Sequence, residues 1–263
     1  MSLPRISVIV PSYNGAKYLR ECLDSIAGQD YPDLELIIMD GGSTDETADI
    51  VASYGDLVTL FVSEPDEGQT DAIDKGFARA TGEVYCWANT DDLLEDGALK
   101  FVGQWFADHP REEFVYGDVT LIDGDSKVIR TIREIPFVRW IWWWGYCYTF
   151  TSSSYWRAGL YHRVGGMDRE FRNSMDVDLF GRFFRLARPR HVTRILSRFR
   201  LHPGQRTWQE RGDMLSDDKR LLARELGRTP SRLEWWVRNV LARGIRLVWR
   251  RVLSVLATVR GAK

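Results

Sequence analysis

Short β-branched runs alternate with helical patterns through residues 1–120, and this alternation constrains the fold more than any other feature of the chain. Strands are expected at residues 6–10, 35–40, 58–63 and 83–88, with helices between them. Alternation of this kind predicts an α/β protein with a mostly parallel sheet flanked by helices. The first helix should bury one face, formed by Tyr18, Leu19, Cys22, Leu23 and Ile26.

The second half of the chain is less regular and richer in aromatic residues. We expect a helix at 98–109, a hairpin turn at 123–125, a segment with four tryptophans at 137–150, and helices at 176–187, 213–226 and 233–259. The length of 263 residues fits one large domain with an appendage better than two full domains. We therefore divide the chain into an α/β domain at 1–210 and a helical, basic, tryptophan-rich extension at 211–263.

Three helical segments carry more specific predictions. Ser43 and Glu46 have the spacing of a capping box at the start of the second helix. The helix at 176–187 should turn Leu179, Phe183 and Leu186 inward. The last helix has one polar stripe, made by Asn239, Arg243, Arg246, Arg250 and Ser254.

Charge is divided unevenly along the chain, although the net charge is only -1. Residues 1–130 contain 26 acidic and 9 basic residues, whereas residues 131–263 contain 11 and 27. The second half could therefore face an anionic partner such as a phosphate or a lipid surface. Alternatively, the two halves simply attract each other, and the sequence leaves both interpretations open.

The cysteines and the start of the chain indicate an intracellular protein. Cys22, Cys86 and Cys147 are odd in number and form no CxxC pair, which argues against a disulfide framework or a cysteine-built zinc site. No long apolar signal region precedes Pro11. The cytoplasm is therefore the expected location.

Polar residues gather after the first, second and fourth strands, where open α/β sheets bind ligands. Asp40 is followed by a Gly-Gly-Ser-Thr-Asp turn, so its carboxylate could accept a hydrogen bond from a nucleobase while glycine admits a close approach. Taken alone, this segment is equally consistent with a plain β-turn that leads into a helix.

A sharper pattern follows the fourth strand. Asn89 and Asp91 point to the same side of an extended chain, and Asp92 comes next. Carboxylate oxygens suit Mg²⁺ or Mn²⁺, which can neutralise the charge of a departing diphosphate. A solvated acidic turn is the alternative interpretation.

Two more segments could complete a site. Asp176 and Asp178 open a predicted helix, and one of these carboxylates could take the proton of an acceptor hydroxyl as general base, although helix capping is an alternative. His202 follows a predicted strand and could add a nitrogen ligand to a metal or contact a phosphate. Arg206 nearby could pair with a diphosphate.

These segments together resemble the inverting family 2 glycosyltransferases of the GT-A fold, in the same order over roughly residues 5–205. SVIVPSYN is similar to the family's first strand and nucleotide loop, and MDGGSTDET puts Asp40 in the place of its base-contacting aspartate. The resemblance implies donor contacts from Pro11, Tyr13, Asn14, Asp40, Gly41, Gln69, Lys75, Asn89 and Thr90.

The resemblance also implies a mechanism of single displacement with inversion. Asp91 matches the metal-binding member of the family's Asp-x-Asp element, with Asn89 replacing the first aspartate, and His202 matches a histidine that reaches the metal or diphosphate. Asp176 takes the catalytic-base position, although Met175 replaces the usual glutamate before it. The cofactor implied is Mn²⁺ or Mg²⁺, with Asp92, Asp178 and Arg206 as accessory residues.

The expected partners are a nucleotide-diphosphate sugar donor and a glycan or lipid-linked acceptor, as in cell-surface polysaccharide or lipid-linked glycan synthesis. The tryptophan- and arginine-rich segments at 139–144 and 233–259 suit a membrane interface at the inner face of the membrane, or a helix packed on the domain. Rival functions are a sugar nucleotidyltransferase and a non-catalytic glycan- or nucleic-acid-binding module. We expect no nucleic-acid partner, because convergent carboxylates repel phosphates unless a metal is present.

Overall fold

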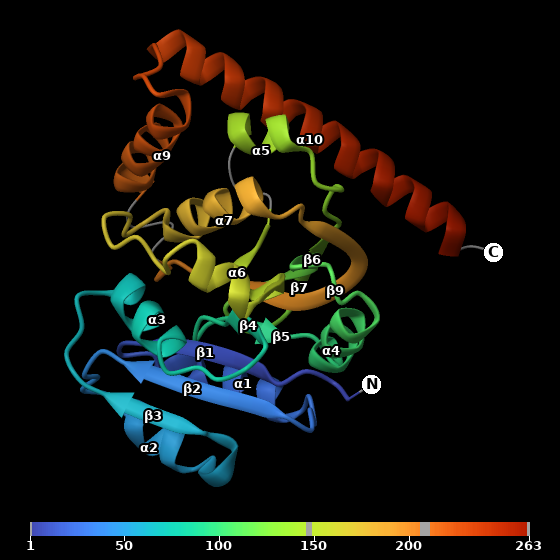
Figure 1. Ribbon diagram of the computed structural model, residues 1–263. Coiled ribbons are helices and arrows are strands. Elements are labelled where there is room, and N and C mark those ends of the chain that lie inside the picture. Colours follow the sequence, from blue (N-terminus) through green and yellow to red (C-terminus); the bar gives the residue numbers. More distant parts are fainter. Residues whose placement is uncertain (1, 146–148, 206–210, 262–263) are drawn as a thin grey trace.

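A computed structural model describes residues 2–145, 149–205 and 211–261 of the chain (Figure 1). The strands are β1 (Ile6–Ser12), β2 (Leu34–Asp40), β3 (Leu60–Ser63), β4 (Val84–Trp87), β5 (Leu93–Leu94), β6 (Phe114–Ile122), β7 (Val128–Ile132), β8 (Ser154–Arg157) and β9 (Arg190–Arg200). The α-helices are α1 (Ala16–Ala27), α2 (Thr47–Ala52), α3 (Gln69–Phe77), α4 (Ala98–Asp108), α5 (Arg139–Gly145), α6 (Ala158–Arg163), α7 (Met175–Leu186), α9 (Arg211–Leu226) and α10 (Arg232–Gly261). Short 3₁₀ turns lie at η1 (Gly55–Leu57) and η2 (Thr151–Ser153).

The described strands form one sheet in the order β3-β2-β1-β4-β8-β6-β9-β5, with β7 paired to β6. The first four strands in this order run parallel, as the alternating sequence pattern predicts. The other half of the sheet is mixed, because β8 pairs antiparallel with both β4 and β6, and β6 and β7 form the predicted hairpin. In the β1–β2 register Ser12 lies opposite Asp40, so the loops that follow these strands start side by side.

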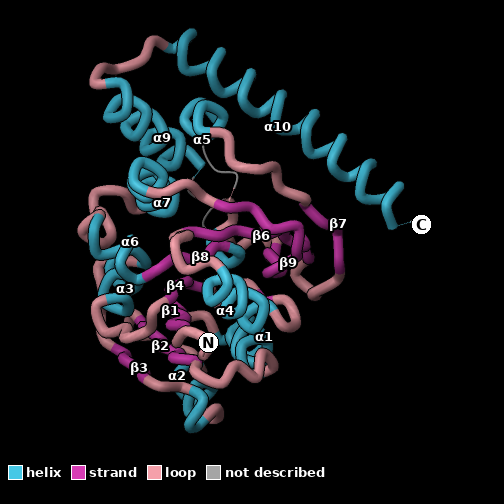
Figure 2. The backbone as a smooth tube through the Cα atoms, turned by 45° about the vertical axis from the view of Figure 1, so that its right-hand side comes forward, coloured by secondary structure: helices cyan, strands magenta, loops and turns pink. Residues whose placement is uncertain are grey.

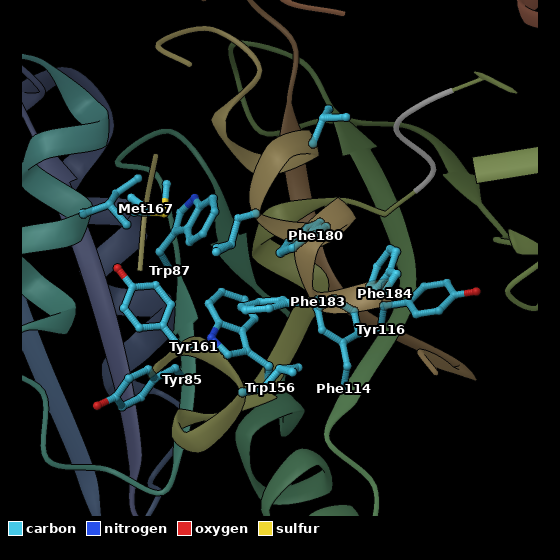
Figure 3. Packing of buried hydrophobic residues seen from close by; sticks show 14 of the residues in the cluster. Tyr85, Trp87, Phe114, Tyr116, Trp156, Tyr161, Met167, Phe180, Phe183 and Phe184 are labelled. Carbon is cyan, nitrogen blue, oxygen red and sulfur yellow. The ribbon is translucent and has the colours of Figure 1, made fainter. Parts of the chain in front are cut away.

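Two apolar clusters stabilise the fold from the two faces of the sheet. One contains the predicted face of α1, whose five apolar residues are all buried. The other is aromatic and lies between the sheet and α7, where the Phe180 ring packs against Trp87 and Trp156 (Figure 3). Aromatic pairs in these arrangements stabilise a core beyond the area they bury. The core therefore fixes α7 against the end of β4.

Two local predictions are wrong. Leu186 is 55% exposed, because it closes the last turn of α7 beyond the aromatic core that buries Leu179 and Phe183. The capping box at Ser43 and Glu46 does not form. The Ser43 hydroxyl is bound to Asp40 instead, and the side chain of Asp45 accepts the backbone N–H of Thr47 at the helix start.

The C-terminal helices lie on the side of the molecule away from β3 (Figures 1 and 2). Helix α10 packs along α5, and Arg224 of α9 pairs with Asp178 of α7. Ion pairs also join the acidic first half of the chain to the basic second half, including Arg169 with Asp71, Arg200 with Glu21 and Arg246 with Glu134. Mutual attraction of the two halves therefore accounts for part of the charge asymmetry.

Candidate active site

Asp91 and His202 meet although 111 residues separate them in sequence. Asp91 lies in the turn after β4, and His202 follows β9. The Asp91 Oδ2 atom and the His202 Nε2 atom are 3.1 Å apart, and the two side chains are 22% and 13% exposed. The structure thus brings together the two residues that the sequence predicted as metal ligands, at a point that solvent reaches.

A fully buried arginine holds this corner of the site. Arg200 donates from Nε to the Asp91 carbonyl oxygen at 3.0 Å, and from its two terminal nitrogens to Ser126 at 2.7 Å and to Glu21 at 3.0 Å. Its guanidinium also stacks over the Tyr18 ring, 4.4 Å from the centroid. Sequence reasoning missed Arg200, because nothing distinguishes it from the many other arginines of the second half.

The residues around Asp91 divide into partly exposed and buried members. Gln69 donates from Nε2 to Asn89 Oδ1 at 2.8 Å, which joins the start of α3 to the turn after β4. Thr90 lies against Gly15, where a Cβ atom would come within 3.1 Å of its side chain. Asp92 is fully buried, and burial together with the charge of Asp91 raises its pKa well above the usual range. Asp92 therefore supports the turn from inside.

The loop after β1 presents the first part of the predicted nucleotide site. Pro11 is buried within β1, whereas Tyr13 is 69% exposed. Asn14 adopts a positive φ of 49° and accepts the Thr44 N–H at 2.9 Å, while its own N–H donates to Ser43 Oγ at 2.7 Å. These bonds tie the loop after β1 to the loop after β2.

Asp40 lies at the end of β2, as the sequence predicts, and its carboxylate already accepts hydrogen bonds from within the protein. It is buried, and it accepts hydrogen bonds from the Ser43 N–H at 2.9 Å, the Ser43 hydroxyl at 2.5 Å and the Ser63 hydroxyl at 2.6 Å. An ionised carboxylate has about four acceptor positions, so one remains for a base. Gly41 cannot be replaced without movement, because a Cβ atom there would approach Asp66 to 2.7 Å.

Lys75 forms ion pairs with two carboxylates of the protein itself. Its ammonium lies 2.8 Å from Asp71 Oδ2 and 3.6 Å from Glu64 Oε1. The hydrogen bond to Asp71 raises the pKa of Lys75. Arg169 contacts the other oxygen of Asp71 at 2.8 Å, so this cluster connects α3 to the loop before α7.

Asp176 lies in the first turn of α7 and is partly exposed. Burial raises the pKa of its carboxyl, while hydrogen bonds from the backbone N–H groups of Val177 and Asp176 itself oppose the rise. The residue before it, Met175, accepts a hydrogen bond from Thr70 Oγ1 at 3.0 Å, and Thr70 directly follows Gln69. A short series of contacts therefore connects the turn carrying Asp91 to the helix carrying Asp176.

Two acidic residues of α9 hold the segment that carries Asp176, and sequence reasoning missed both. Asp217 Oδ2 accepts the Asn173 N–H at 3.2 Å, and Asp218 Oδ1 accepts the Ser174 hydroxyl at 3.1 Å. Burial and the nearby charge of Asp176 raise the pKa of Asp218 to about 6. No sequence signal marks these residues, because an acidic pair within a predicted helix usually belongs to a solvated face.

Asp178 stabilises the packing of α7 through ion pairs. It is buried, and it pairs with Arg182 at 2.6 Å and with Arg224. These contacts connect α7 to α9 and leave Asp178 no free carboxylate oxygen. Arg206, the remaining predicted accessory residue, lies outside the described residues.

The Asp91–His202 pair fits a divalent metal bound together with a substrate. A carboxylate oxygen and an imidazole nitrogen at 3.1 Å can share one ion, and Mg²⁺ and Mn²⁺ commonly complete their coordination with phosphate oxygens and water. Within the described part of the chain, no cluster of three or more His, Cys, Asp or Glu side chains forms a closed metal cage.

Solved structures with the same architecture define the class of fold. The chain matches the 1–349 fragment of S. aureus TarS in complex with UDP-GlcNAc with a TM-score of 0.69 and 19% identity, covering 94% of this chain and 74% of that one. It matches the Pyrobaculum calidifontis mannosyltransferase PcManGT in complex with GDP-Man and Mn²⁺ with a TM-score of 0.64 and 20% identity, covering 100% and 81%. The chain spans 41% of a longer TarS chain. The protein has the GT-A fold of glycosyltransferases.

Sequence comparison gives the family. The model of glycosyl transferase family 2 matches residues 7–173, which is more than half of the chain. A "PGL/p-HBAD biosynthesis glycosyltransferase" of Mycobacterium tuberculosis is 32% identical over 200 residues, covering 74% of this chain and 75% of the relative. The chain belongs to glycosyl transferase family 2.

Proposed function

We propose that the protein transfers a sugar from a nucleotide-diphosphate donor to an acceptor hydroxyl, with inversion at the anomeric carbon. The observation that carries the proposal is the pairing of Asp91 with His202 at 3.1 Å, joined through Gln69 and Thr70 to the helix that begins beside Asp176. In this proposal the strand-end loops bind the donor, and the start of α7 binds the acceptor. Membership of the transferase family favours this function over a nucleotidyltransferase or a binding module.

The acceptor side performs the proton transfer. As the acceptor oxygen attacks the anomeric carbon, the bond from that carbon to the diphosphate oxygen breaks, and the hydroxyl proton moves to the Asp176 carboxylate. Desolvation that raises the pKa of Asp176 strengthens it as a base, while hydrogen bonds from backbone N–H groups at the start of α7 oppose that rise. Attack opposite the leaving group inverts the configuration in a single step.

The donor side binds and orients the nucleotide. Asn14, Asp40 and Gly41 border the base and ribose site, whereas Gln69 and Asn89 lie closer to the diphosphate. Asp91 and His202 would hold Mn²⁺ or Mg²⁺, which when bound neutralises charge on the departing diphosphate. Pro11, Tyr13, Lys75 and Thr90 complete the proposed donor set.

The proposed biological setting is cell-surface polysaccharide or lipid-linked glycan synthesis at the cytoplasmic face of a membrane. The similar mycobacterial protein is named for PGL/p-HBAD biosynthesis, which supports a glycan product. The tryptophan- and arginine-rich segments of α5 and α10 support contact with a lipid-linked acceptor. Among the described residues, no helix combines the length and apolar character needed to span a bilayer.

The test is release of nucleoside diphosphate from UDP-, GDP- and dTDP-sugars with Mn²⁺ or Mg²⁺, in the presence of membrane lipid extract as acceptor. Metal-dependent release with one donor class is expected for the wild type, and loss is expected for Asp91→Asn and Asp176→Asn. Asp96→Asn is the matched control, since Asp96 is an exposed carboxylate in the same loop region. Absence of release from every donor, with a protein that still binds glycan, would favour the binding module.

A further inference from the structure

Helix α10 turns Asn239, Arg246 and Arg250 of its polar stripe toward the protein. Arg246 lies 2.9 Å from Glu134, Arg250 also pairs with Glu134, and this glutamate is completely buried. Asn239 is buried on the same side of the helix, next to the buried Ala242. A helix on the surface of a soluble protein normally buries its apolar face. The ion pairs with Glu134 therefore fix α10 in the opposite orientation.

The outer face of α10 is apolar and uncovered. We define this outer face by its exposed apolar residues: Leu233, Trp236, Val237, Val240, Leu241, Ile245, Leu247, Val248, Trp249 and Val252. At 100° per residue these side chains cover a broad arc of the helix circumference. Val248 is 65% exposed and Leu233 70%. A contiguous apolar surface of this kind usually marks an interaction site.

The charge of α10 indicates which kind of partner this face binds. Residues 232–261 contain seven arginines and one acidic residue, Glu234, which is already paired with Arg228 and Arg238. Of these arginines, Arg232, Arg243 and Arg251 are exposed. A second copy of the chain would bring like charges together without carboxylates to pair them, whereas an anionic surface would neutralise them.

The tryptophans agree with a lipid surface. Trp236 of α10 is 57% exposed and Trp140 of the adjoining α5 is 43% exposed. Tryptophan favours the depth of lipid headgroups, where its ring is covered and its N–H stays hydrated. Figure 1 shows α10 at the edge of the molecule, with its C-terminal part extending beyond the body.

We propose that the outer face of α10 docks on a bilayer that contains anionic phospholipid, with the helix lying in the plane of the interface. The apolar side chains enter the boundary between headgroups and acyl chains, and the exposed arginines contact lipid phosphates. The buried Glu134 forms ion pairs with Arg246 and Arg250, and these pairs keep the apolar face of α10 turned outward. The inference rests on the proposed function for its lipid-linked acceptor, but the surface itself does not depend on catalysis.

The test is flotation of the full-length protein with vesicles of phosphatidylcholine, with and without phosphatidylglycerol. We expect the wild type to float with the anionic vesicles and to be released by high salt. Val248→Glu should lower the bound fraction about tenfold, since it exchanges a buried apolar contact for a repelled charge. Val128→Glu is the matched control, because Val128 is 64% exposed on β7, outside α10.

The two proposals fail in distinguishable ways. Asp176→Asn should float like the wild type while releasing no nucleoside diphosphate, and Val248→Glu should still release it from a soluble donor and acceptor. Wild-type protein that stays with the unbound fraction, or a Val248→Glu variant that floats normally, would overturn the docking surface. A wild-type dimer in sedimentation that Val248→Glu dissociates, without any flotation, would assign this face to a second copy instead.

Discussion

The proposed donor side and the proposed acceptor side of the candidate active site are built from different kinds of structure. On the donor side, loops that follow β1, β2 and β4 start next to one another because their strands pair in parallel. On the acceptor side, Asp176 begins a helix whose preceding segment is held by Asp217 and Asp218 of α9. Helix α9 thus supports the proposed acceptor side.

The electrostatic environments of the two sides differ as well. Asp91 faces His202, and the buried Arg200 binds its carbonyl oxygen. Asp176 is instead desolvated beside a second carboxyl, and burial raises the pKa of both acids. A carboxylate oxygen beside an imidazole nitrogen suits the binding of a metal together with a diphosphate, whereas a desolvated carboxylate suits the capture of a proton. The proposed division of roles follows from this contrast.

Removing the arginine that supports the donor side should have the largest effect on stability. Arg200→Met leaves the Asp91 carbonyl and the Ser126 hydroxyl without their buried donor. We expect a loss of about 3 kcal/mol in the free energy of unfolding, measured by urea titration. Arg198→Met is the control and should cost less than about 1 kcal/mol, because the Arg198 side chain is 36% exposed in its pair with Glu95. Equal losses for both variants would contradict a special role of Arg200.

Substitution of Asp91, one of the two proposed metal ligands, should have the next largest effect. Asp91→Asn should weaken Mn²⁺ binding about 10- to 100-fold in the presence of a nucleoside diphosphate, measured by electron paramagnetic resonance of the free ion. The fold should be retained, because Arg200 binds the backbone carbonyl of Asp91 and not its side chain. An unchanged Mn²⁺ affinity would remove Asp91 from the metal site.

The sequence predicts the donor side better than the acceptor side for a physical reason. Parallel strands end at one edge of a sheet, so Asp40, Asn89 and Asp91 could be grouped from their positions after strands alone. The residues that hold the segment before Asp176 lie more than 40 residues away, on a helix whose packing depends on tertiary contacts. Likewise, the polar stripe of α10 was visible in the sequence, but its inward orientation depends on Glu134.

The smallest expected effect concerns the second carboxyl of the acceptor side. Asp218 has a pKa of about 6 in the folded protein, above its ordinary value of 3.8. The folded state therefore binds this proton more tightly than the unfolded chain, and wild-type stability falls as pH rises from about 4 to about 6. Asp218→Asn keeps an oxygen acceptor for the Ser174 hydroxyl and removes this pH-dependent loss of stability.

We therefore expect Asp218→Asn to match the wild type near pH 4 and to be more stable by roughly 1 to 2 kcal/mol at pH 7. Chemical denaturation at a series of pH values measures the difference. Asp217→Asn is the neighbouring control and should show no comparable gain, since Asp217 pairs with Arg220. A difference between Asp218→Asn and the wild type that does not change with pH would contradict the shared desolvation of the acceptor side.

The central claim is that Asp176 takes the acceptor proton while other residues bind the donor. Its most direct test compares Asp176→Asn with the wild type in donor binding, by isothermal titration, and in transfer, by single-turnover release of nucleoside diphosphate. The account predicts donor affinity within about twofold and transfer slowed by about 100-fold or more. Transfer at the wild-type rate, with the same pH dependence, would contradict it.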